Sequence, residues 1–75
     1  MVYGRVVYVK SEEKNPFTLV TVKGNGDGKR HVVPVPNEVY EKAVDKNKGT
    51  LWENEIEIET VEIKGKTSMV IRVFH

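Results

Sequence analysis

NEVYEKAVDKNKG, residues 37–49, is the stretch that decides the fold, because it has helical periodicity in a chain that otherwise has the patterns of strands. We expect Asn37 to cap the first turn of a helix and Gly49 to end it in the left-handed conformation. One face of this helix is apolar and is formed by Val39, Tyr40, Ala43 and Val44. The pattern predicts a helix of about eleven residues.

Three strand-like segments precede the helix. They are rich in β-branched residues and comprise Val2–Lys10, Phe17–Lys23 and Arg30–Val35. A polar loop separates the first two, and the glycine-rich run 24–28 is typical of a hairpin turn between the second and third.

A long strand-like segment, Thr50–Lys64, follows the helix. Its glutamates at 53, 55, 57 and 59 share one parity, and the opposite, inward parity holds Trp52, Ile56 and Ile58. After Thr60 the apolar parity shifts to Val61 and Ile63, which predicts a bulge or bend there. A turn at 65–66 leads to a last strand whose inward residues are Met69, Ile71 and Val73.

The element order is therefore β-β-β-α-β-β, typical of a five-stranded Greek-key barrel of the OB type, with the helix closing one end. An SH3-like barrel is the main alternative, but it usually lacks a full helix at this point. Seventy-five residues suffice for a single domain, 1–75. Disulfides are excluded because the chain has no cysteine.

The net charge of +1 conceals a marked asymmetry. Residues 37–63 hold eight acids and three bases, whereas the rest of the chain holds nine bases and three acids. Neither a signal peptide nor an apolar run near the ~20 residues of a membrane span is evident. We therefore expect a soluble, cytoplasmic protein with no membrane partner.

The sequence gives little support for catalysis, and we predict no enzyme activity, no cofactor and no metal site. The alternating glutamates are typical of a solvated strand face. The glycine run 24–28 followed by Lys29 resembles a phosphate-binding loop, but a strand rather than a helix follows it.

Binding is better supported. In an OB barrel the strands are ordered first, second, third, fifth, fourth, first, so the acidic fourth strand lies away from the face of the second and third. We predict that single-stranded nucleic acid, with DNA favoured over RNA, binds this basic face without catalysis. The expected phosphate contacts are Arg5, Lys23, Lys29, Arg30, Lys64, Lys66 and Arg72. Outward parity makes Tyr3 and Phe74 the expected stacking residues, and we expect Tyr8, Phe17 and Tyr40 in the core.

Two segments resemble known single-strand-binding proteins. Gly4-Arg5-Val6-Val7 through Phe17-Thr18-Leu19-Val20 resembles the opening strands of bacterial and phage OB proteins. The segment Ile63–Val73 looks like the final hairpin of small single-stranded DNA-binding proteins, and initiation-factor-1-like RNA-binding domains are similar in length and element order. The resemblance implies an accessory role in replication, recombination or translation.

A protein-interaction module is the alternative. In that interpretation the acidic fourth strand, or a sheet edge near Pro34, binds a basic partner or a second copy of the chain, giving a homodimer or a larger assembly.

Overall fold

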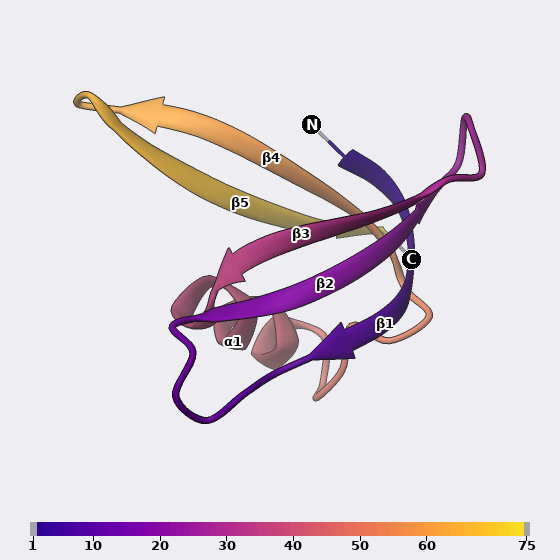
Figure 1. Ribbon diagram of the computed structural model, residues 1–75, viewed down its shortest axis with the longest axis horizontal. Helices are drawn as coiled ribbons and strands as arrows, with labels where there is room; N and C mark the ends of the chain where they lie inside the picture. Colours follow the sequence, from indigo (N-terminus) through magenta and orange to yellow (C-terminus); the bar gives the residue numbers. More distant parts are fainter. Residues whose placement is uncertain (1, 75) are drawn as a thin grey trace.

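The computed structural model describes residues 2–74 and has the predicted order of elements (Figure 1). These are β1 (Val2–Lys10), β2 (Phe17–Gly24), β3 (Arg30–Pro36), α1 (Asn37–Lys46), β4 (Glu55–Ile63) and β5 (Lys66–Phe74). Within residues 2–74, no helix is long and apolar enough to cross a membrane.

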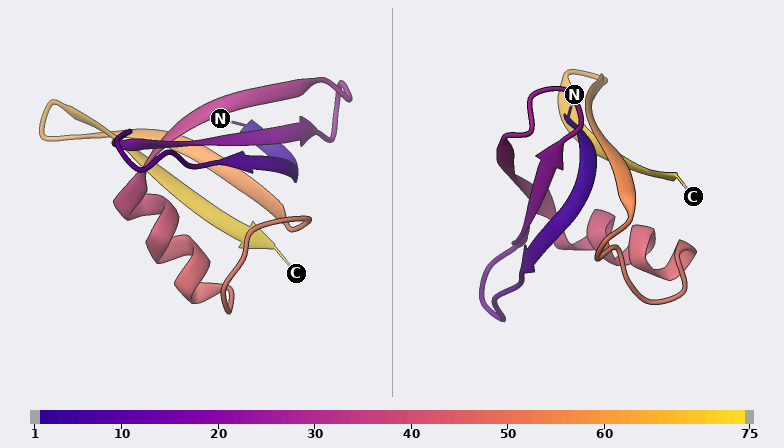
Figure 2. Two further views of the ribbon diagram at one scale, coloured as in Figure 1. Left: turned by 60° about the horizontal axis from the view of Figure 1, so that its bottom comes forward. Right: turned by 90° about the vertical axis from the view of Figure 1, so that its right-hand side faces the viewer.

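The strands form one antiparallel sheet in the order β3-β2-β1-β4-β5. Each neighbouring pair in this order is also a neighbouring pair in the order expected for the barrel. Between residues 2 and 74 the remaining pair, β3 with β5, is not formed, so the sheet coils but stays open (Figure 2). A mostly β architecture with one helix is confirmed, whereas the closed barrel is not observed. Pro34 and Pro36 supply no N–H at the β3 edge, which weakens any strand pairing there.

The core lies between the concave side of the sheet and α1. The fully or almost fully buried apolar side chains are Val6, Val20, Val22, Val35, Ala43, Leu51, Ile56 and Ile58. Tyr40 and Val44 pack against this cluster, as the helical periodicity predicts. Leu51 belongs to a loop and was not predicted in the core, although burying a leucine contributes about 1.5–3 kcal/mol.

Asn37 does not cap α1 but connects it to the loop between β1 and β2. It is the first helical residue, after Pro36, and its side chain makes no capping hydrogen bond. Its Oδ1 accepts from the Thr18 hydroxyl at 2.8 Å, and its Nδ2 donates to the Asn15 carbonyl at 2.8 Å. At the other end the helix stops before Gly49 as predicted, but Lys48, with a φ of 59°, takes the left-handed position that was expected for the glycine. Gly49 follows with a φ of 109°, and its N–H donates to the Val44 carbonyl.

The strand after the helix begins at Glu55, not at Thr50. Residues 50–54 form a turn in which the Thr50 hydroxyl accepts from the Trp52 N–H at 3.0 Å. Glu53 adopts a φ of 65°, which no continuous strand contains. Trp52, which the strand alternation placed on the inward side in the core or at its rim, is therefore 45% exposed.

The bulge lies in β1 rather than in β4. The register of β4 with β5 runs without a break from Glu55–Phe74 to Ile63–Lys66. In β1 the register with β2 shifts between Val6 and Tyr8. The predicted bulge after Thr60 is therefore wrong.

Gly4 permits a close approach between β1 and β2. A Cβ atom at this position would lie 2.1 Å from the Lys23 carbonyl oxygen, which is too close for two atoms that are not bonded to each other. The absence of a side chain therefore sets the spacing of the two strands where Arg5 and Lys23 are neighbours in register.

Candidate nucleic-acid interface

Three basic residues form a row across three adjacent strands. Arg5 on β1 is in register with Lys23 on β2, and Lys23 is in register with Arg30 on β3. All three side chains are exposed, and buried Val6 and Val22 alternate with two of them. Among the described residues, none of the three forms an ion pair with an acidic side chain. The row, which we call the basic row, is therefore a concentration of positive charge that no ion pair among the described residues neutralises.

Apolar side chains lie beside the basic row on the same outer face. Tyr8, Thr21 and Val32 are in register on β1, β2 and β3. Tyr8 is 54% exposed and Val32 is 60% exposed. At the far end of β2, Phe17 is 43% exposed and is in register with Pro36. We call Tyr8, Phe17 and Val32 the apolar patch.

The prediction that Tyr8 and Phe17 belong to the core is therefore wrong. Strict alternation from Val6 places Tyr8 inside, but the extra residue at the bulge turns Tyr8 outward. Phe17 points outward because its neighbour Thr18 takes the buried position and is satisfied there by Asn37. Neither effect has a signature in the spacing of apolar residues.

Tyr3 and Phe74, the predicted stacking residues, contact each other. Their ring centroids are 5.6 Å apart, in an edge-to-face arrangement at 67°. The Tyr3 hydroxyl donates to Glu55 at 3.2 Å. Desolvation and the Glu55 carboxylate raise the pKa of Tyr3 above its ordinary value. The ring pair thus lies beside an acidic strand, where a phosphate would meet repulsion.

Arg72 lies among the acids of β4. Its guanidinium is 3.1 Å from a carboxylate oxygen of Glu59 and 3.6 Å from one of Glu57. This differs from the expectation that acidic and basic residues occupy separate faces. Because β4 pairs with β1 as well as with β5, the acidic residue Glu55 lies in register with Arg5 at the β1 end of the basic row.

The remaining predicted contacts lie at opposite ends of the molecule. Lys64 is in the two-residue turn between β4 and β5, and Lys66 follows it; in Figure 1 this turn is at the upper left. Lys29 adjoins the turn between β2 and β3, which is at the upper right. The longest dimension of the molecule is 32 Å. The nine predicted residues therefore do not form one surface.

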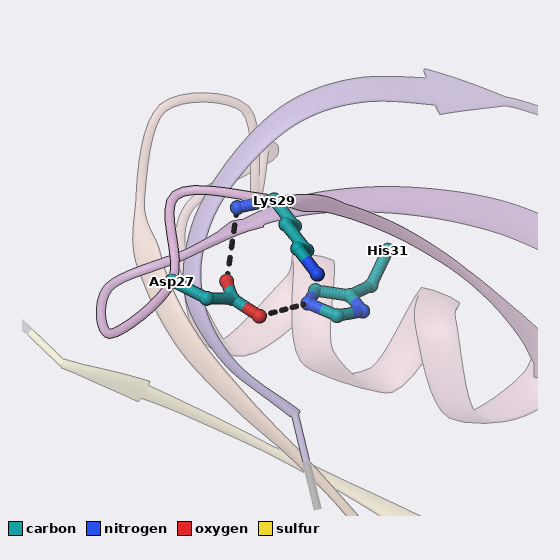
Figure 3. A network of polar contacts seen from close by, with 3 residues as sticks. All are labelled: Asp27, Lys29 and His31. Carbon is teal, nitrogen blue, oxygen red and sulfur yellow. Dashed lines mark hydrogen bonds and ion pairs between the residues drawn. The ribbon is translucent and has the colours of Figure 1, made fainter.

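Asp27 organises the turn that carries Lys29 (Figure 3). One carboxylate oxygen accepts from the Lys29 backbone N–H at 2.9 Å, and the other is 3.5 Å from Nε2 of His31. The Lys29 N–H, with a further contribution from His31, lowers the pKa of Asp27 below its ordinary value. These contacts hold the turn immediately before Arg30 enters β3.

The sequence was compared with protein-family models, curated proteins and solved structures, and none of them matches it. Among residues 2–74, no group of three or more histidine and acidic side chains has the arrangement of a metal site. The surface chemistry of the outer face is therefore the feature of the protein that bears on its function.

Proposed function

We propose that the chain binds single-stranded nucleic acid, DNA in preference to RNA, across the outer face of β1, β2 and β3. The basic row is the observation that carries this proposal. Like charges directly opposite one another on neighbouring strands destabilise a sheet. A phosphate backbone lying across Arg5, Lys23 and Arg30 would neutralise them and release counterions.

The apolar patch supplies the second requirement of such a site. Exposed aromatic rings provide surfaces on which bases stack, at about 1–3 kcal/mol per base. Tyr8 and Phe17 lie on the outer face of β1 and β2 beside the basic row, whereas the rings of Tyr3 and Phe74 pack against each other and the Tyr3 hydroxyl donates to Glu55. We therefore assign base stacking to Tyr8 and Phe17.

We further infer that the fold is an OB barrel opened between β3 and β5. The order β3-β2-β1-β4-β5 is the order of an OB barrel interrupted at that one junction. The face of the second and third strands is the surface on which OB domains bind oligonucleotides. The proposed role is binding, and no catalytic step is assigned to the chain.

A protein-interaction role through the acidic strand or the Pro34 edge has less support. Glu57 and Glu59 already pair with Arg72, which reduces the charge available to a basic partner. Pro34 removes an edge donor that strand pairing would need.

Fluorescence anisotropy with labelled oligo-dT and oligo-U at several salt concentrations tests the proposal. Three phosphate contacts predict a slope of log K against log salt near −2, from about −0.7 per contact on single strands. A triple variant with Arg5→Gln, Lys23→Gln and Arg30→Gln should lose most of this dependence.

The matched control removes three lysines elsewhere, with Lys14→Gln, Lys42→Gln and Lys46→Gln. It has the same net charge as the triple variant and should retain binding. Equal losses in the two variants, or no salt-dependent binding by the unmodified protein, would refute the proposal.

A further inference from the structure

The two edges of the sheet differ in their capacity to accept another strand. β3 carries prolines at positions 34 and 36, whereas β5 carries none over its nine residues. β5 pairs with β4 along its whole length, and no backbone hydrogen bond to another described element is formed on its other side. No residue of β5 is buried. An edge of this length and composition is suited to strand addition.

The pairing pattern identifies the residues that face outward from this edge. The turn between β4 and β5 has two residues, Lys64 and Gly65, with φ angles of 53° and 77°. In such a hairpin the residues flanking the turn form the hydrogen-bonded pair, so every second residue after it directs its N–H and C=O away from the partner strand. These outward-facing residues are Thr67, Met69, Ile71 and Val73.

A groove runs between this edge and α1, and Figure 2 shows the helix and β5 side by side. One part of the groove has a volume of about 260 Å³. Its apolar lining comes from Val39, Ala43, Met69, Val70 and Ile71, and its charged lining consists of Lys42 and Lys46. The adjoining part is bounded by Asn47, Arg72 and Val73. The lining of the groove is therefore mainly apolar, and its charged residues are cations with no acids among them.

We propose that this groove binds an extended acidic segment of another protein, which adds to β5 as a sixth strand. Main-chain hydrogen bonds to the outward-facing residues would hold the segment. Its alternate side chains would lie on opposite faces of the sheet, acidic ones toward α1 and its Lys42 and Lys46, and aliphatic ones on the outer face beside Val70. The site is separate from the outer face proposed for nucleic acid and does not depend on it.

The edge chemistry favours a polypeptide over a nucleic-acid strand. A strand edge presents alternating donors and acceptors, and a second polypeptide backbone satisfies both. A phosphate backbone offers acceptors along its length, so the outward C=O groups of β5 would stay unpaired.

A second copy of this chain fits the groove less well than an acidic segment. The β5 edge of a second copy would bring its own Lys42 and Lys46 to the same junction. The β3 edge of a second copy would bring Arg30 and two prolines. Both arrangements lack the acids that the groove favours.

The test uses the full chain labelled with ¹⁵N and a capped seven-residue peptide of alternating glutamate and valine. We expect amide shifts on titration to concentrate in β5, from Thr67 to Val73, and along the groove side of α1. A lysine–valine peptide of the same pattern should not bind. A glutamate–valine peptide with a central proline should bind more weakly, because it lacks a main-chain donor.

Matched charge reversals locate the binding surface. The Lys42→Glu, Lys46→Glu double variant should bind the acidic peptide about tenfold more weakly or worse, because two surface attractions become repulsions. The Lys23→Glu, Arg30→Glu double variant should bind the peptide with unchanged affinity and should bind oligo-dT more weakly.

The proposal fails if millimolar glutamate–valine peptide causes no amide shifts, or if the lysine–valine peptide binds with equal affinity. It also fails if the two double variants reduce the affinity for the acidic peptide to the same extent. Displacement of the peptide from β5 by oligo-dT would assign the groove to nucleic acid. A dimer in sedimentation whose amide shifts lie on β5 would assign it to a second copy. Either result would overturn the proposal in favour of that occupant.

Discussion

Replacing Lys23 by glutamine should stabilise the protein and weaken its proposed function at the same time. Lys23 is the middle of the basic row, with Arg5 on one side and Arg30 on the other. Two unit charges about 5 Å apart in water repel by about 0.8 kcal/mol. A Debye length of about 8 Å at physiological salt roughly halves this value. Because Lys23 has two such neighbours, removing its charge should raise the free energy of unfolding by roughly 0.5–1 kcal/mol.

The same substitution removes one proposed phosphate contact. The slope of log K against log salt should become shallower by about 0.7 for a single-stranded ligand. Urea denaturation measures the first effect, and anisotropy with oligo-dT measures the second. Lys14→Gln, in the loop before β2, removes a charge far from the row and should change neither quantity by a comparable amount.

Either of two results would refute this reasoning. A Lys23→Gln variant that is less stable than the unmodified protein would show that the basic row is not a site of repulsion. An unchanged salt slope would show that Lys23 does not contact the ligand.

Three further predictions follow from the fold and the outer face. Tyr8→Ala combined with Phe17→Ala should weaken the binding of oligo-dT by about 1–3 kcal/mol for each lost stacking partner, as measured by anisotropy. The far-UV circular dichroism spectrum should stay unchanged. Gly4→Ala should cost at least ~3 kcal/mol in urea denaturation, because the added Cβ meets the Lys23 carbonyl oxygen; a smaller loss would mean that β1 and β2 separate easily. The pKa of Asp27 is lowered on folding, so its carboxylate stabilises the fold at pH values above the ordinary aspartate pKa, and this contribution disappears as the pH falls through the lower, folded-state pKa. Asp27→Asn should therefore reduce stability at neutral pH and lessen its decline in acid, and parallel acid-denaturation curves for the two proteins would contradict this.

The order and type of the elements could be predicted because local signals specify them. The helical period of residues 37–49, the glycine-rich turn and the β-branched runs each act over a few residues. Most strand bounds agree with the expected ones to within a residue or two. The late start of β4 is an exception, because the turn at residues 50–54 is set by the Thr50 hydroxyl and by the contacts of Val6 with Glu53 and Asn54.

The arrangement of the candidate site was predictable only in part. Arg5, Lys23 and Arg30 were expected on one face, and the register brings them together. The exposure of Tyr8 could not be foreseen, since a one-residue bulge leaves no mark in the sequence yet reverses every later side chain in its strand. The position of Arg72 beside Glu57 depends on the register of the β4–β5 hairpin, whose turn is at Lys64 and Gly65 rather than at the expected residues 65–66.

The short ladder between β1 and β4 has a consequence for how the protein folds. It contains four register pairs, from Val2–Ile58 to Arg5–Glu55, and is the only strand pairing among the described residues that joins the two halves of the sheet. The hairpins on either side of it close over short loops, whereas this ladder brings together residues such as Tyr3 and Glu55, 52 positions apart. Loop closure of that length carries the largest entropic cost in the sheet. The rate at which the molecule folds should therefore depend on how often the first few residues of the chain find β4.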